Sequence, residues 1–223
     1  MVLEIISVYF RRNKRLILDN FNLKLRKSQI IILIGDNGVG KSSLLDISVG
    51  ILKPEKGTVK INKIPLEDLE SDKKKKFTYI PHKDSLKDYL TVEENLVSWL
   101  SISENKISKK EFYESLKFFN LHKISQNPIS NLSHGQRKKV SLTKLLLSKS
   151  KLWLLDEPFN GLDTSSINKC KILIYDHIKN DGSIILSSHI DIKLKGSKKI
   201  FIKKPEKNFK QRNINLSSWD DIR

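Results

Sequence analysis

Gly35-Asp-Asn-Gly-Val-Gly-Lys-Ser42 is the stretch of sequence that decides the fold. Before it stands a short run, Ile30 to Ile34, that is apolar on both faces, as a strand buried inside a parallel sheet is. After it, apolar residues recur at helical spacing from Leu44 to Gly50. The order strand, glycine-rich loop, helix and the spacing G-x-x-x-x-G-K-S predict a loop that cradles the phosphates of a nucleotide. A plain glycine turn before a helix is the weaker interpretation in this context.

Each part of this loop has a physical task. Glycines let the backbone curl, so that successive N–H groups and the N-terminus of the next helix point at the phosphates. Lys41 is expected to reach the β and γ phosphates and to act in catalysis, and Ser42 is expected to coordinate Mg²⁺. The residues of the loop predicted to bind nucleotide are Gly35, Asp36, Asn37, Gly38, Val39, Gly40, Lys41, Ser42 and Ser43.

A second apolar run, Leu152 to Leu155, ends in two adjacent carboxylates, Asp156 and Glu157. Ligands of open α/β sheets bind at the carboxyl ends of the strands, which is where these acids stand. Asp156 is therefore predicted to hold the Mg²⁺ shell, and Glu157 to polarise the attacking water as general base. Such a pair alone is weak evidence, because many strands end in acids that only cap a helix. The segments around the pair strengthen the interpretation.

Two segments flank the acid pair: Leu132-Ser-His-Gly-Gln136 upstream and Pro158-Phe-Asn-Gly-Leu-Asp163 directly after it. Taken with the glycine loop, Leu-Ser-x-Gly-Gln resembles the signature motif of the ATP-binding cassette (ABC) family. The resemblance implies a homodimer in which the signature of one subunit closes over the ATP held by the other. It implies that Ser133, Gly135 and Gln136 bind the γ-phosphate of the opposite site from the start of a helix.

The same resemblance gives roles to two more residues. Asp163 matches the aspartate that crosses the dimer seam in the family. His189 follows the predicted strand Ile184 to Leu186 and two serines, and it matches the switch histidine that contacts the γ-phosphate. A lone histidine at such a place is more often structural, but the other motifs stand in the family's order. His189 is therefore predicted to be catalytic.

Two positions depart from the usual cassette pattern. Arg12 stands where most cassettes place the aromatic residue that stacks on adenine, with Tyr9 and Phe10 as nearby alternatives. An arginine plane can also stack on adenine. His82 stands where the family has a glutamine that senses Mg²⁺ and touches the membrane partner. Imidazole can replace an amide as donor or acceptor but can also be protonated, so His82 is predicted to contact nucleotide and metal.

The run Ile80 to Leu96 and the segment Leu152 to Phe159 resemble one subfamily, the ATP-binding subunit of the heme exporter of cytochrome c maturation. This implies an ATP- and Mg²⁺-dependent hydrolase bound to multi-span permease subunits, with turnover linked to heme export or to release of a heme-loaded chaperone. It also implies a peripheral place on the cytoplasmic face of the inner membrane, or on the matrix face in an organelle. No direct heme binding is expected, because the five histidines are scattered and Cys-x-x-Cys-His is absent. An exporter of another cargo, such as a lipid, peptide or drug, is the leading alternative.

The formal net charge of +17 could attract nucleic acid or anionic lipid. The lysines are dispersed, apart from Lys73 to Lys76, and the chain has no alanine, which favours compositional bias as the cause. A soluble nucleic-acid or ribosome-associated cassette is less favoured, because such proteins usually carry two cassettes or a long coiled-coil insertion. No direct nucleic-acid contact is expected.

The elements predict an α/β fold: a P-loop NTPase (RecA-like) core with a parallel sheet, an antiparallel β subdomain at the N-terminus, and a helical signature subdomain at about residues 88–138. The antiparallel part is expected to hold strands at residues 3–8, 16–18 and 21–25. With 223 residues the chain can bury one core, so 1–203 is predicted to be one domain, followed by a polar basic tail at 204–223.

Three observations bear on where the chain works. Its longest apolar run, Ile30 to Ile34, is far too short to span a membrane. The N-terminus lacks the pattern of a signal peptide. The single cysteine, Cys170, excludes an internal disulfide and is typical of a reducing compartment.

Overall fold

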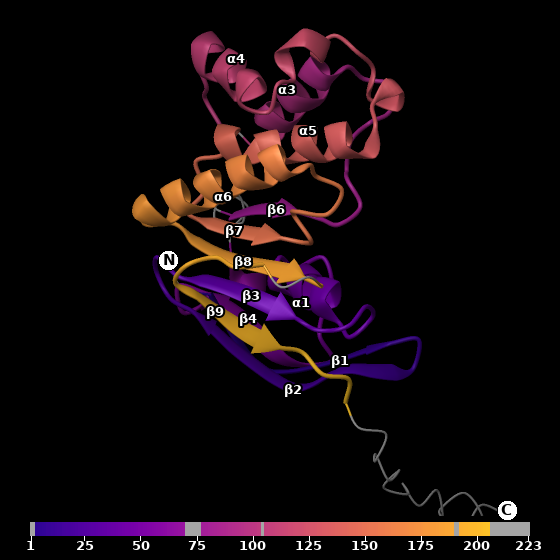
Figure 1. Ribbon diagram of the computed structural model, residues 1–223. Helices are drawn as coiled ribbons and strands as arrows, with labels where there is room; N and C mark the ends of the chain where they lie inside the picture. Colours follow the sequence, from indigo (N-terminus) through magenta and orange to yellow (C-terminus); the bar gives the residue numbers. More distant parts are fainter. Residues whose placement is uncertain (1–2, 70–76, 104, 190–191, 206–223) are drawn as a thin grey trace, which may run out of the picture.

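The computed structural model describes residues 3–69, 77–103, 105–189 and 192–205 (Figure 1). The strands are β1 Leu3–Arg12, β2 Arg15–Leu25, β3 Ile30–Ile34, β4 Lys56–Ile61, β5 Ile64–Pro65, β6 Phe77–Ile80, β7 Leu152–Leu155, β8 Ser183–Ser188 and β9 Ser197–Phe201. The α-helices are α1 Lys41–Ser48, α3 Val92–Ser103, α4 Lys109–Phe118, α5 His134–Leu147 and α6 Thr164–Lys179.

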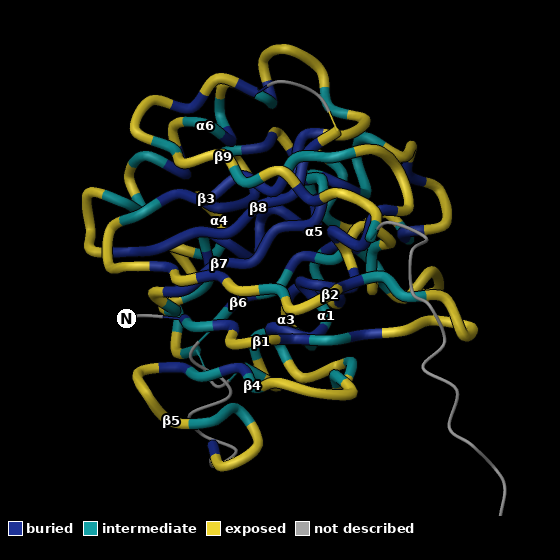
Figure 2. Tube along the Cα trace, turned by 90° about the horizontal axis from the view of Figure 1, so that it is seen from below, coloured by how far each residue is buried: buried dark blue, intermediate teal, exposed yellow. Residues whose placement is uncertain are grey.

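A parallel sheet with the strand order β6-β7-β8-β3-β9 forms the centre of the molecule. Alternate residues of its strands face opposite sides, so two separate apolar cores form. Ile32 and Leu186 face the core shared with α5 and α6, whereas Ile31 and Leu33 face the core shared with α1 and the N-terminal strands. Figure 2 shows the central strands β3, β7 and β8 as buried along their length. This double burial confirms the expectation drawn from Ile30–Ile34.

An antiparallel sheet with the order β2-β1-β4-β5 covers the α1 side. The separate strands predicted at 16–18 and 21–25 form one strand, β2. Its pairing with β1 shifts register three times, between Ile5 and Val8, between Val8 and Phe10, and directly after Phe10. Such irregularities let a polar break pass without ending the ladder, which is why Asp19 and Asn20 do not divide the strand.

The helical part consists of α3, α4 and the start of α5, and lies at the far side of the parallel sheet from β1 and β2 (Figure 1). Within the helical subdomain predicted at about residues 88–138, α3 and α4 are separate helices. Ser108 begins α4 with a reciprocal capping box, in which its hydroxyl accepts from the Glu111 N–H and the Glu111 carboxylate accepts from the Ser108 N–H. Such a cap starts a new helix and is worth about 1 kcal/mol.

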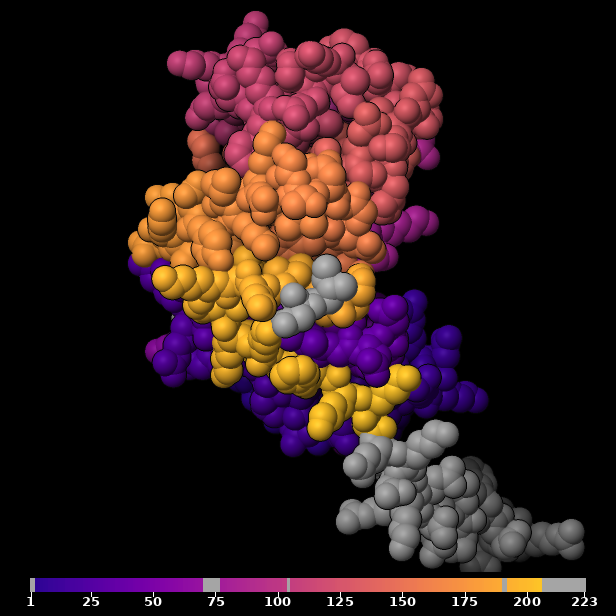
Figure 3. All heavy atoms as spheres, viewed as in Figure 1, coloured from indigo at the N-terminus to yellow at the C-terminus, as the bar shows by residue number. Residues whose placement is uncertain are grey.

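Strand β9 was not expected from the sequence. Its residues are mostly polar, but they pair with β3 at the edge of the sheet, where a strand needs little hydrophobicity. The space-filling view shows residues of about 150–200 as a band between the helical part and the N-terminal part (Figure 3). Residues 206–223 of the predicted tail and Lys73 to Lys76 lie outside the described residues. Within the described ranges, no helix is long and apolar enough to cross a membrane.

Candidate nucleotide site

A pocket of about 610 Å³ opens at the carboxyl ends of the parallel strands. Segments that follow β3, β6, β7 and β8 contribute to it, together with Arg12 at the end of β1 and Ile17 near the start of β2. This is the place where open α/β sheets bind ligands. Its lining residues are Arg12, Ile17, Asn37, Gly38, Gly40, Lys41, Ser42, Ser43, His82, Glu157, Asn160 and His189.

The glycine loop lies at the start of α1 with its backbone in conformations that favour glycine. Gly38 and Gly40 have φ of 75° and 111°, and Gly40 is the N-cap of α1. A Cβ on Gly40 would lie 2.6 Å from the Ile17 side chain. Lys41 is buried, and its Nζ donates to the carbonyls of Gly35 at 2.6 Å and Asp36 at 3.0 Å. The loop therefore holds one cation at the mouth of a helix N-terminus, a place suited to phosphate.

Asp156 is held rigidly beneath the pocket. It is 1% exposed, and its N–H donates to the carbonyl of Ile80 at 2.8 Å. Its carboxylate accepts a 2.5 Å hydrogen bond from the hydroxyl of Ser187, which also accepts from the Glu157 N–H at 2.9 Å. Ser187 thus fixes both acids. Sequence reasoning missed its role, although the two serines after Ile184–Leu186 were its visible signal.

Glu157 lies between two histidines. Its Oε2 is 3.1 Å from Nδ1 of His189 and 3.5 Å from Nδ1 of His82. The side chain of Glu157 is 12% exposed, against 39% for His189 and 54% for His82. Its φ of 47° is unusual for a residue other than glycine, and such strained positions cluster at functional sites. The three residues come from the ends of three strands. Between the two histidines, the carboxylate of Glu157 is suited to accept a proton from water.

The structure distinguishes among the three residues considered for adenine stacking. Arg12 lines the pocket, whereas Phe10 is 8% exposed and packs in the core with Leu18. Tyr9 is not among the lining residues of this pocket. Ile17 and Asn160 also line it, and sequence reasoning did not identify either residue.

The signature residues lie apart from this pocket. Ser133 is the N-cap of α5 and forms a capping box with Gln136, while a Cβ on Gly135 would lie 2.8 Å from the carbonyl of Gly161. Asp163 is the N-cap of α6, and it accepts from Lys139 Nζ at 2.7 Å. The bond from Lys139 lowers the pKa of Asp163 below its usual value, and bonds from Ser166 lower it further. None of these residues is among those that line the pocket at the glycine loop.

The donors near the glycine loop fit Mg²⁺, which prefers oxygen ligands. Ser42 supplies a hydroxyl at the pocket wall and Asp156 a carboxylate below it. The nitrogen of His82 is a softer ligand than Mg²⁺ prefers, and its Nδ1 faces Glu157. The described residues contain no group of three or more His, Cys, Asp or Glu side chains placed to hold a metal. Mg²⁺ in nucleotide enzymes usually binds through one or two protein groups and the phosphates.

Comparison with known proteins places this geometry in a family. The sequence model of the ABC transporter family matches residues 18–160. A curated cytochrome c biogenesis ATP-binding export protein, CcmA, from Pseudomonas fluorescens is 32% identical over 84% of this chain and 89% of its own length. The protein of the same name from Histophilus somni is 32% identical over 85% of this chain and 88% of its own length.

Solved structures agree. An ABC transporter ATP-binding protein from Pyrococcus furiosus superposes with a TM-score of 0.78 at 25% identity, covering 91% of this chain and 98% of that one. A dimeric ATP-binding cassette bound to ADP and phosphate superposes with the same TM-score and identity, covering 91% and 94%. The chain therefore belongs to the ABC transporter family of ATP hydrolases, in the group of the cytochrome c biogenesis ATP-binding export proteins.

Proposed function

We propose that this chain is the ATP-hydrolysing subunit of a membrane export complex for cytochrome c biogenesis, in which turnover drives heme export or release of a heme-loaded chaperone. The observation that carries the ATPase part is the pocket that joins Lys41 of the glycine loop to Glu157 between His82 and His189. The cargo part rests on the names of the relatives and on the sequence runs Ile80–Leu96 and Leu152–Phe159.

The proposed chemistry assigns one task to each group. The loop N–H groups and Lys41 hold the β and γ phosphates, with Arg12 against the adenine. Ser42 and Asp156 are the residues that would hold Mg²⁺, which supplies charge neutralisation at the phosphates when bound. Glu157 accepts a proton from the attacking water, and His189 donates a hydrogen bond to the γ-phosphate.

We further propose that two copies are needed for one complete site. Ser133, Gly135 and Gln136 at the start of α5 would meet the γ-phosphate held by the other copy, with Asp163 at the seam between them. The helix N-terminus supplies backbone N–H groups and a partial positive charge for that anion. The support in this chain is that the signature lies outside the pocket that holds the glycine loop.

A mixing experiment tests the shared site. Lys41→Ala and Ser133→Arg chains should each be inactive alone. Combined, they should regain part of the ATPase activity, because a mixed dimer has one doubly damaged site and one intact site. Wild-type protein that hydrolyses ATP as a monomer, measured by light scattering at assay concentration, would refute the shared site.

The proposed place of work is the cytoplasmic face of the inner membrane, or the matrix face in an organelle, bound to permease subunits. The described residues offer no spanning helix, so attachment would come through those partners. Deleting the gene should abolish covalently bound heme in c-type cytochromes while sparing b-type cytochromes. Heme staining of membrane proteins on a denaturing gel measures this, because only covalent heme survives the detergent.

Complementation separates the two parts of the proposal. The wild-type gene should restore the stained c-type bands, and Glu157→Gln should not. Unchanged c-type bands in the deletion strain would remove the cargo assignment and favour an exporter of another cargo. Disturbed ribosome profiles, with c-type bands reduced only in proportion to growth, would favour a ribosome-associated role instead.

A further inference from the structure

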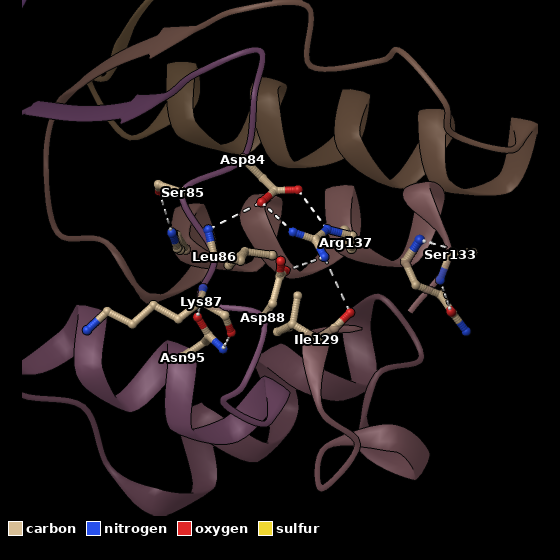
Figure 4. A network of polar contacts seen from close by, with 11 residues as sticks. Asp84, Ser85, Leu86, Lys87, Asp88, Asn95, Ile129, Ser133 and Arg137 are labelled. Atoms are coloured by element: carbon tan, nitrogen blue, oxygen red, sulfur yellow. Dashed lines mark hydrogen bonds and ion pairs between the residues drawn. The ribbon is translucent and has the colours of Figure 1, made fainter. Parts of the chain in front are cut away.

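An ion-pair cluster joins the segment after β6 to helix α5. Arg137 lies near the start of α5, and its Nε and Nη2 donate to the two carboxylate oxygens of Asp84 at 2.9 and 3.0 Å. Its Nη1 donates to Asp88 at 2.6 Å and to the carbonyl of Ile129 at 3.5 Å. Figure 4 shows the guanidinium between the two carboxylates. A paired fork of this kind fixes direction as well as distance.

The pair formed by Arg137 and Asp84 is largely shielded from water. The side chains of Arg137 and Asp84 are 22% and 17% exposed, whereas Asp88 is 66% exposed. Burial raises the pKa of Asp84, but hydrogen bonds from Arg137 and from the Leu86 N–H outweigh it and keep that pKa below its usual value. The hydrogen bonds to Asp84 also raise the pKa of Arg137. Both shifts favour the charged forms of Asp84 and Arg137.

The same segment is fastened on its other side by α3. Asn95 is 6% exposed, and its Nδ2 donates to the carbonyls of Lys87, Leu90 and Thr91 at 3.1, 3.2 and 2.9 Å. Its Oδ1 accepts from the Lys87 N–H at 2.8 Å. Residues 84–91 are thus held from two helices, so a displacement of α5 would be transmitted along the segment to its beginning.

His82 lies two residues before Asp84, and its side chain faces Glu157 in the pocket. The other partner, α5, is capped at its N-terminus by Ser133, four residues before Arg137. The next two residues of α5 are also basic and reach other parts of the site: Lys138 Nζ donates to the carbonyl of Asp156 at 3.4 Å, and Lys139 pairs with Asp163. The start of α5 is therefore tied to three segments of the nucleotide site.

We propose that Arg137 is a positioning residue for ATP turnover. It sets the position of His82, which faces the nucleotide site of its own subunit, relative to Ser133, which serves the site of the other subunit. The inference rests on the proposed roles of His82 and Ser133. Arg137 does not line the nucleotide pocket, so it acts through the Asp84 segment. Because small displacements of catalytic groups cost large factors in rate, its loss should lower kcat more than it changes binding.

The experiment compares steady-state ATPase of the full chain in Arg137→Gln, Asp84→Asn and the double variant. We expect kcat per nucleotide-binding site to fall about tenfold in each single variant, with KM for ATP changed less than about twofold. The double variant should be no slower than the slower of the two single variants, because the effects of substitutions at two contacting residues are not additive. Arg137→Lys keeps the charge but not the fork, and it should recover part of kcat.

The matched control is Lys24→Gln, which removes an ion pair with Glu4 of 2.7 Å on the N-terminal sheet. It should leave kcat and KM unchanged. Asp84→Asn preserves the shape of the side chain, so it keeps the test usable if Arg137→Gln does not fold. Its melting temperature shows whether it is folded. A wild-type kcat in Asp84→Asn, or losses that multiply in the double variant, would overturn the proposal. Glu157→Gln in the same series separates the two ideas: if it is inactive while Asp84→Asn is normal, only this inference fails.

Discussion

The two ends of the parallel sheet both carry histidine, in opposite surroundings. At the carboxyl ends, His82 and His189 are partly exposed and face the carboxylate of Glu157. At the amino ends, His177 stacks on Trp153 with ring centroids 3.6 Å apart and planes 9° from parallel. No described residue hydrogen-bonds to Nε2 of His177 or Nε1 of Trp153.

The difference shows how one residue type serves two purposes in one sheet. Loops at the carboxyl ends leave room for a ligand, and their polar groups converge there. At the amino ends the chain is packed, and a Cβ on Gly182 would lie 2.2 Å from the His177 ring. Burial lowers the pKa of His177 from its ordinary 6.5 to about 4, so its ring is neutral in the folded protein near neutral pH. Chemistry should therefore depend on one end and stability on the other.

The largest expected effect is at the carboxyl end. Glu157→Gln should lower ATP turnover by about 100-fold or more, because it removes the proposed general base while leaving the glycine loop intact. Nucleotide affinity, measured by fluorescence titration, should stay within about twofold of wild type. The control is Glu114→Gln, an exposed acid on α4, which should be fully active. Near-normal turnover by Glu157→Gln would show that another group is the base.

Lys41→Ala should damage binding as well as rate. In the proposed site the ammonium contacts the phosphates in both ground and transition states, so we expect at least about tenfold losses in nucleotide affinity and in turnover. Calorimetry measures the first and phosphate release the second. Lys117→Ala removes an exposed lysine of α4 and should change neither. Unchanged affinity in Lys41→Ala would contradict the role given to this residue.

The same substitution at each end gives the most direct test of the comparison. His189→Gln should lower turnover about tenfold without a change in melting temperature. His177→Gln should leave kcat per folded molecule unchanged but lower the free energy of unfolding by about 1 kcal/mol, because the stacking on Trp153 is lost. Urea unfolding and steady-state kinetics on both variants provide the readouts. If both variants lost activity and kept stability, the proposed division between the two ends would be wrong.

The amino end should also give a pH dependence of stability. Since the folded-state pKa of His177 is about 4 against 6.5 unfolded, the unfolded chain binds more protons between these values, and stability falls as pH drops through that range. Because the ring is partly exposed, we expect the free energy of unfolding to fall by about 1–2 kcal/mol, which is less than the whole shift in pKa would give. His177→Phe should reduce this slope in urea unfolding at about pH 7 and about pH 5. An identical slope in both proteins would contradict the assignment.

Much of the pocket could be predicted from contiguous motifs. The glycine loop and the acid pair each follow a strand in sequence, so their place at the strand ends is fixed by local order. By contrast, Ser187, Ile17 and Asn160 belong to the site only because distant segments meet there. Ser187 lies 30 residues from Glu157 and accepts a hydrogen bond from its N–H. No rule of sequence spacing predicts that bond.

Packing also decided which of the three candidates for adenine stacking lines the pocket. Tyr9, Phe10 and Arg12 lie on one strand, and the usual alternation would place Tyr9 on the face opposite to Phe10 and Arg12. The register shifts between β1 and β2 alter that alternation, so which side chain reaches the pocket depends on the pairing partner. The strand β9 was missed for a related reason, since its polar residues are held by β3 and not by their own apolar pattern.

The sequence by itself determined the family and the order of its motifs, because each motif is a short run whose function depends on neighbouring residues. Only the tertiary structure decided that Glu157 lies between His82 and His189, that Asp84 pairs with Arg137 across 53 residues, and that His177 stacks on Trp153. These contacts join residues far apart in the chain. Their geometry follows from strand register and helix packing, which arise from the whole core and not from local sequence.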